Sequence, residues 1–249
     1  MLTVPDVPNI KIDGAKVAAL ANQALGPGND TLAQGSAGHY ERTIAALFAR
    51  IARAATGRAV LKAIRKRSEH VMTVEPELMK RPGMKPNAFA EALDTRAAGR
   101  PGRGSSTLIT ISPSDWTGHM PELPGAVGGY TGPGTAVDEL LLHEVFHGLR
   151  HMAGLRMKRS VPGQKEYHNF EEFYAILIAN IYRSELGRSG LRADHAGFYT
   201  LGDVGIVSQD AWMKHKFNRG HLRKLGNQMP DLWDALAKVK AAFNPIAAF

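Results

Sequence analysis

Cysteine is absent from this chain of 249 residues. Without cysteine the chain can form no disulfide framework, no thiolate metal site and no cysteine nucleophile. A metal ion bound by this protein must therefore be held by histidine, aspartate or glutamate side chains.

Long hydrophobic runs are also absent. Residues 1–16 lack the basic region followed by an apolar stretch that marks a cleavable signal peptide. No segment approaches the run of about 20 apolar residues that a helix needs to cross a bilayer. We therefore expect a soluble protein that carries no cleavable secretory signal.

Acidic residues are fewer than basic ones. The chain has 31 Lys and Arg against 23 Asp and Glu, a net charge of +8 and a pI near 9.8. Such an excess attracts polyanions, among them nucleic acid and acidic protein surfaces. The densest basic run, residues 62–67, lies where a predicted helix ends, and cations there complement the helix dipole. The dispersed charges and the lack of a nucleic-acid motif argue against nucleic acid as a partner.

Hydrophobic residues make up 44% of the chain, enough to bury the core of one large domain. Residues 1–37 mix Pro, Gly, Asn and Asp around a short helical patch at 15–25, so we expect a loosely structured lead-in before a domain at 38–249. Helical spacing from 39 to 67, divided near Gly57, is followed by a short strand at 71–74 and a surface loop at 81–106.

Residues 107–112 alternate hydroxyl and aliphatic side chains before Pro113 and predict a half-buried strand at a sheet edge. The fold class is therefore α+β, mostly helical with a small mixed sheet. Thr135 to Asp138 has the form of a capping box with Asp in place of Glu, so a helix should begin near Ala136. Gly154 is placed to end this helix, and a further helix is predicted from 169 to about 186.

The first of these helices contains His143-Glu144-Val145-Phe146-His147. Residues four apart lie one above the other on a helix, about 6 Å apart along its axis, so the two imidazoles can share one ion. Glu144 points further round, where it can contact a water in an open coordination position and take its proton. This pattern is typical of a catalytic zinc site. The alternative is that both histidines are satisfied by hydrogen bonds in the core.

A third protein ligand is expected from the next helix. Glu172 shares a helical face with Ile176 and Ala179 and points towards the core, which favours it over Glu171 as the ligand. Glu171 is better placed to orient a zinc-bound imidazole from behind. Asp138 is a further candidate for that orienting role, and its alternative role is the helix cap.

Three further residues, His151, Tyr167 and His195, could contribute to the same site. His151 lies two turns beyond His143 and cannot converge on the same ion, so we expect a surface or supporting histidine. The developing oxyanion of a hydrolytic reaction needs a donor opposite the metal. Tyr167, close to the third ligand, and His195 are the candidates, with core packing as the alternative for Tyr167.

Two segments together carry a family resemblance. Residues 142–147 and 169–175 resemble the catalytic domain of anthrax lethal factor and the zinc metallopeptidases that pathogenic bacteria inject into host cells. Segments 56–61 and 182–192 are similar to the second group, and the likeness covers roughly residues 40–200. In one respect the sequence departs from lethal factor, whose catalytic Tyr stands seven residues before the ligand Glu: position 165 is Lys here.

The resemblance implies a zincin-like fold, zinc as cofactor and endopeptidase activity towards a protein substrate, one whose surface could be acidic. It also implies a bacterial effector or toxin, made in the cytoplasm and passed by a specialised secretion system into a target cell. An immunity protein or a part of the secretion apparatus would then be a partner. In such folds the edge strand before the catalytic helix binds the peptide, a role assigned to residues 107–112.

Two other classes of function remain open from the sequence. The chain could be a zinc hydrolase that acts on bonds other than peptide bonds. It could also be a basic binding module whose histidines are structural. Metal content separates the last of these from the other two.

Overall fold

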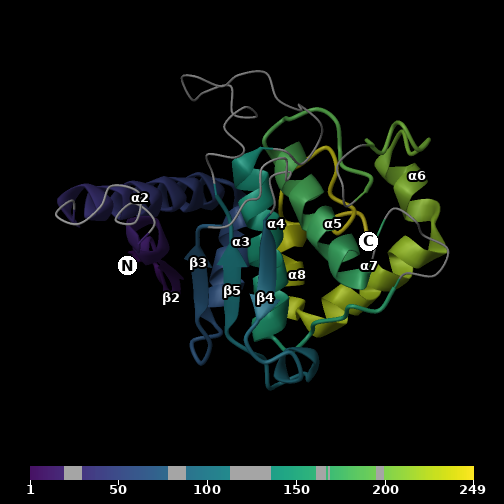
Figure 1. Ribbon diagram of the computed structural model, residues 1–249. Coiled ribbons are helices and arrows are strands. Elements are labelled where there is room, and N and C mark those ends of the chain that lie inside the picture. Colours follow the sequence, from purple (N-terminus) through teal and green to yellow (C-terminus); the bar gives the residue numbers. More distant parts are fainter. Residues whose placement is uncertain (20–29, 78–87, 113–135, 161–166, 168, 195–198) are drawn as a thin grey trace.

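A computed structural model describes residues 1–19, 30–77, 88–112, 136–160, 167, 169–194 and 199–249. Within them an α+β arrangement combines one mixed sheet with helices that pack against it (Figure 1). None of the helices in these residues is long and apolar enough to span a membrane.

The sheet has the strand order β1-β2-β3-β5-β4. Its three inner strands run parallel, and an antiparallel strand closes each edge. The strands are β1 (Leu2–Val4), β2 (Val7–Ile12), β3 (Met72–Glu75), β4 (Phe89–Ala92) and β5 (Thr107–Thr110). Their buried aliphatic side chains, such as Ile10, Ile12, Val74 and Ile109, form the part of the core that the helices cover.

The expected loose lead-in is wrong for residues 2–12, which form β1 and β2. Asp6, with φ of 62°, makes the turn between these strands. Ile10 then pairs with Met72 and Ile12 with Val74 of β3. The prolines and polar residues suggested a loop, but β1 pairs with β2, and β2 pairs with residues of β3 some 60 positions away. Residues 15–19 are helical as expected, whereas 20–25 lie outside the described residues.

The predicted strand at 107–112 is present as β5, but it does not form the sheet edge. It lies between β3 and β4, and β4 occupies the edge. The prolines, glycines and charges of residues 81–106 predicted a surface loop, and Phe-Ala-Glu-Ala at 89–92 has little of the β-branched character typical of a strand. Antiparallel pairing with β5 and a hydrogen bond from the Thr107 hydroxyl to the Glu91 carbonyl hold β4 in place.

Helices make up most of the remaining described structure. They are α2 (Asp30–Arg53), α3 (Ala55–Arg65), η1 (Ala97–Gly99), α4 (Val137–Met152), α5 (Phe170–Glu185), α6 (Gln209–Lys214), α7 (Lys216–Gln228) and α8 (Pro230–Ala237). The break between α2 and α3 falls at Ala54 and not near Gly57. Gly57 instead allows a close approach of the two helices, because a Cβ there would lie 2.0 Å from the Ile51 carbonyl oxygen.

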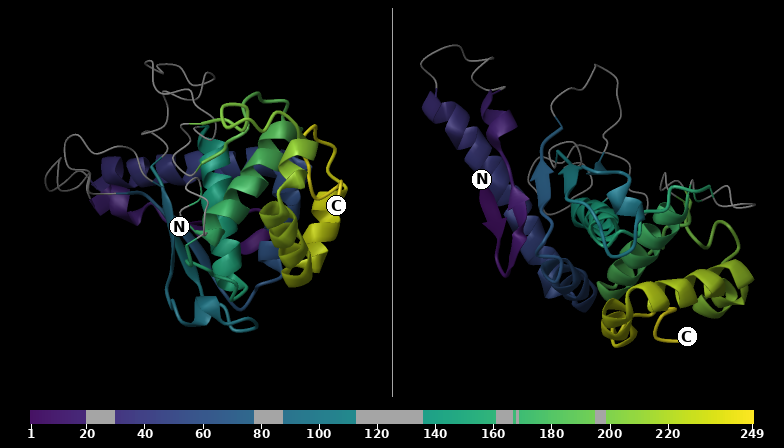
Figure 2. Two further views of the ribbon diagram at one scale, coloured as in Figure 1. Left: turned by 90° about the vertical axis from the view of Figure 1, so that its right-hand side faces the viewer. Right: turned by 90° about the horizontal axis from the view of Figure 1, so that it is seen from below.

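Helix α4 is the central helix of the molecule. All of its residues are buried, and it contacts α5 as well as strands β4 and β5 (Figures 1 and 2). It begins at Val137 as predicted and ends at Met152, followed by Gly154 with φ of 71°. Asp138 does not cap the helix, because its carboxylate accepts from the Tyr182 hydroxyl of α5 and pairs with Arg188. The two central helices are thus locked together at one end.

Candidate metal centre

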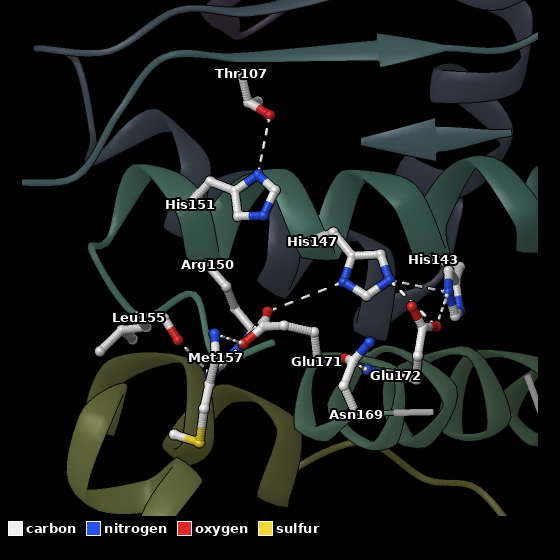
Figure 3. A network of polar contacts seen from close by, with 10 residues as sticks. All are labelled: Thr107, His143, His147, Arg150, His151, Leu155, Met157, Asn169, Glu171 and Glu172. Atoms are coloured by element: carbon white, nitrogen blue, oxygen red, sulfur yellow. Dashed lines mark hydrogen bonds and ion pairs between the residues drawn. The ribbon is translucent and has the colours of Figure 1, made fainter. Parts of the chain in front are cut away.

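Helix α4 presents His143 and His147 on one face, as the four-residue spacing predicts. Their Nε2 atoms lie 3.1 Å apart, and the rings meet edge to face with centroids 4.7 Å apart. Both side chains are buried. The two imidazole nitrogens therefore converge on one point instead of facing separate partners (Figure 3).

Glu172 reaches the same point from α5. Its Oε2 atom lies 3.1 Å from His143 Nε2 and 3.5 Å from His147 Nε2. The start of α5 fixes this position, because the side chain of the N-cap residue Asn169 accepts a hydrogen bond from the Glu172 backbone N–H. Among the described residues, His143, His147 and Glu172 are the one set of three such side chains close enough to hold a single ion.

The spacing of the three donor atoms fits a small divalent cation. Tetrahedral bonds of about 2.0–2.1 Å to nitrogen and oxygen would separate the donors by about 3.4 Å. The observed separations of 3.1, 3.1 and 3.5 Å agree with that geometry. Without an ion, Glu172 would be the shared partner of both rings, and the two Nε2 atoms would face each other over 3.1 Å. The cluster is therefore a metal-binding triad by its geometry.

Glu171 stands behind His147, where the sequence analysis expected it. Its Oε2 atom is 3.9 Å from His147 Nδ1, the nitrogen that faces away from the cluster. Metal binding through Nε2 leaves a proton on Nδ1, and a carboxylate there favours that tautomer. Burial alone would raise the pKa of Glu171, but the ion pair with Arg150 outweighs it and lowers that pKa to about 2. Glu171 is thus an anion at neutral pH.

Arg150 is the member of this network that the sequence analysis missed. It is fully buried and binds Glu171 through Nε, 2.9 Å from Oε2, and through Nη2, 3.0 Å from Oε1. Nη2 also donates to the Leu155 carbonyl, and the guanidinium lies 4.3 Å from the centroid of the Tyr174 ring. An arginine three residues after a ligand histidine, on a helix predicted to be mostly buried, was the available signal.

Glu144 lies beside the triad and lines a pocket of about 200 Å³. Strand β4 and the residue before it, Ala88, form one wall, and His147 and Glu172 contribute to the other. Burial raises the pKa of Glu144 to about 7, although a hydrogen bond from the Ala90 backbone N–H acts in the opposite direction. A carboxylate with a pKa near neutrality can accept a proton and return it.

The two histidines differ in protonation when no ion is bound. Burial lowers the pKa of His143 to about 3, so this ring is neutral and keeps a lone pair for a metal. Burial would also lower the pKa of His147, but its contacts with Glu171 and Glu172 outweigh burial and raise that pKa to about 10. A divalent cation would replace the proton on His147, because its charge serves the same two carboxylates.

Arg192, which follows α5, approaches the triad from the side opposite His147. Its Nη1 atom is 3.5 Å from His143 Nδ1, and its backbone is held by two hydrogen bonds with the Asn180 side chain. The sequence analysis singled out residues 191–195 for their His195. His195 lies outside the described residues, and Arg192 is the residue of that segment seen next to the site.

Two other predicted residues have other surroundings. Tyr167 is buried and packs edge to face on Phe173, with ring centroids 5.3 Å apart. Its role as an oxyanion donor stays a prediction. His151 is not part of the triad, in agreement with the prediction, but it is buried, with Nδ1 3.2 Å from the Thr107 hydroxyl.

Comparison with known proteins adds no family to this picture. No protein-family model matches the chain, and no curated protein is significantly similar to it. The resemblance to effector metallopeptidases therefore depends on the motifs alone. The structure itself establishes a buried His143, His147 and Glu172 triad, with the HExxH sequence on α4, in an α+β fold.

Proposed function

We propose that this protein is a zinc-dependent endopeptidase. The observation that carries the proposal is the convergence of His143, His147 and Glu172 on one point, with Glu144 beside it at a pocket. Two imidazoles and one carboxylate are the ligand set of a catalytic zinc site that keeps a fourth position open. The three described side chains would hold the ion.

Zinc in such a site polarises the scissile carbonyl and lowers the pKa of water towards 7. With the ion bound, Glu144 would take a proton from the attacking water and pass it to the leaving amine, since its carboxylate lines the pocket beside the triad. Glu171, fixed by Arg150, keeps the His147 ring in the orientation that directs Nε2 at the metal position. Arg192 supplies positive charge next to His143, where it would stabilise developing negative charge.

The sheet edge favours a polypeptide substrate. The Leu93 N–H bonds to Ser106 on the β5 side, so the alternating N–H groups of Ala90 and Ala92 point away from β5. The Ala90 N–H is directed at Glu144. The outer edge of β4 therefore faces the site, and an extended peptide that added to this edge would pass over Glu144. The role of peptide-binding strand moves from residues 107–112 to β4.

The wider biological setting is proposed on the family resemblance alone. An effector or toxin role, passage through a specialised secretion system and an immunity or secretion partner stay predictions. An effector or toxin of this kind acts on the proteins of another cell, and an endopeptidase of narrow specificity could do so.

The general-base role of Glu144 is tested by Glu144→Gln. We expect this variant to bind zinc as wild type does and to lose at least about a hundredfold in cleavage of a peptide library, since general-base catalysis contributes roughly 10²–10⁴-fold. Zinc content by elemental analysis and cleavage by mass spectrometry are the two readouts. Glu69→Gln, an exposed residue with the same change, is the control and should retain both. Full activity in Glu144→Gln would remove Glu144 from the mechanism.

A further inference from the structure

A basic segment follows α4 and borders the pocket. Residues 156–159 read Arg-Met-Lys-Arg. Their backbone groups form hydrogen bonds at both ends and in the middle of this segment. The Arg156 N–H donates to the Ala98 carbonyl, and the Arg159 carbonyl accepts from the Phe170 N–H at the start of α5. The segment therefore has a fixed course alongside the site.

The middle bond ties this segment directly to the metal centre. The Met157 N–H donates to Glu171 Oε1 over 2.7 Å, and the other oxygen of Glu171 faces His147 (Figure 3). Lys158 is the next residue, and it lines the same pocket as Glu144 and Glu172. The pocket wall beyond His147 thus carries a lysine whose backbone is anchored.

The charge of Lys158 has no acidic partner among the described residues. The three carboxylates of the pocket are already engaged, since Glu171 pairs with Arg150, Glu172 contacts the two histidines and Glu144 accepts from the Ala90 N–H. Lys158 is exposed and acts electrostatically on His151, which lines the same pocket.

We propose that Lys158 selects substrates that carry an Asp or Glu side chain next to the scissile bond. This proposal rests on the endopeptidase function proposed above and names its substrate class. A substrate carboxylate would pair with the Lys158 ammonium, while the adjoining backbone lies along β4. Lys158 is a specificity-determining residue and takes no part in the proton transfers of Glu144.

The test profiles the cleavage sites in a library of proteome-derived peptides with zinc-loaded wild type, Lys158→Glu and Lys62→Glu. Wild type should cut preferentially beside Asp or Glu, by about fivefold over Gln or Asn. Lys158→Glu should reverse the preference towards Lys or Arg. Lys62→Glu makes the same change of charge at an exposed position of α3 and should keep the wild-type preference.

Binding provides a readout that is independent of turnover. Zinc-loaded Glu144→Gln is titrated with fluorescein-labelled decapeptide pools that differ only in a central Glu, Gln or Lys, and anisotropy is measured. The Glu pool should bind about fivefold tighter than the Gln pool, and adding Lys158→Glu should reverse the order of the Glu and Lys pools.

The possible outcomes distinguish a failure of the role of Lys158 from a failure of the proposed endopeptidase function. Cleavage by wild type without preference for acidic residues, or a preference that survives Lys158→Glu, overturns the role of Lys158 and leaves the endopeptidase intact. Cleavage of no peptide by zinc-loaded wild type, with equal binding of the three pools, overturns both.

Discussion

His151 lies one turn beyond His147 on α4, and its environment makes a pH effect on stability predictable. Burial lowers its pKa to about 3, and the neutral ring shares a hydrogen bond with the Thr107 hydroxyl. In the unfolded chain the pKa returns to about 6.5. Between these two values the unfolded state binds more protons, so this histidine contributes stability near pH 7 that is lost as the pH falls below about 6.5.

We therefore expect His151→Gln to reduce the acid sensitivity of the zinc-free protein. From pH 7 to pH 5, protonation of His151 in the unfolded state should cost about 2 kcal/mol of unfolding free energy. Urea denaturation of wild type and variant at both pH values, in the presence of a chelator, gives the change in unfolding free energy from pH 7 to pH 5 for each protein. An equal change in the two proteins would mean that His151 is protonated in the folded state as readily as in the unfolded state.

At the scale of elements, the position of the site depends on two helices and one strand. Helix α4 supplies two histidines, α5 supplies Glu172, and the outer edge of β4 borders the pocket. The histidine spacing and the start of α5 are local properties, set by helical periodicity and by the Asn169 cap, so the sequence predicted them. Strand β4 has no such local signal.

The edge role of β4 leads to a prediction for Ala92→Pro. The Ala92 N–H points away from β5, so proline there removes no bond within the sheet, and edge strands tolerate it. It does remove a donor to an added peptide strand. We expect unchanged zinc content and unfolding free energy, and a KM raised severalfold for peptide substrates. Steady-state kinetics on a cleaved peptide measure this, with the fold checked by circular dichroism.

An unchanged KM in Ala92→Pro would show that the substrate does not pair with β4 at this residue. A loss of zinc would show instead that β4 supports the metal ligands. Ala88→Gly, before the strand, is the control for local backbone change.

At the scale of the whole molecule, what the sequence could not predict has a common physical cause. Strands β1 and β2 were expected as a loose lead-in because β2, with which β1 pairs, has its other pairing partner on β3, far along the chain. Arg150 was missed because its partner Glu171 comes from another helix. Contacts between distant segments leave no periodic pattern in the sequence, whereas a metal motif on one helix does.

The charge of the whole molecule is also relevant to the site. A net charge of +8 says little about a partner by itself. The basic segment at 156–159 brings Lys158 to the pocket wall, where we propose that it selects an acidic substrate. Charge that seemed dispersed in the sequence thus becomes relevant through the fold.

The most direct test of the account is the zinc stoichiometry of the protein, measured by elemental analysis after reconstitution and removal of free metal. We predict about one zinc per chain in wild type, and none retained when both His143 and His147 are replaced by alanine. Wild type that retains no zinc, or a double variant that retains as much as wild type, would contradict the metal centre on which the proposed function depends.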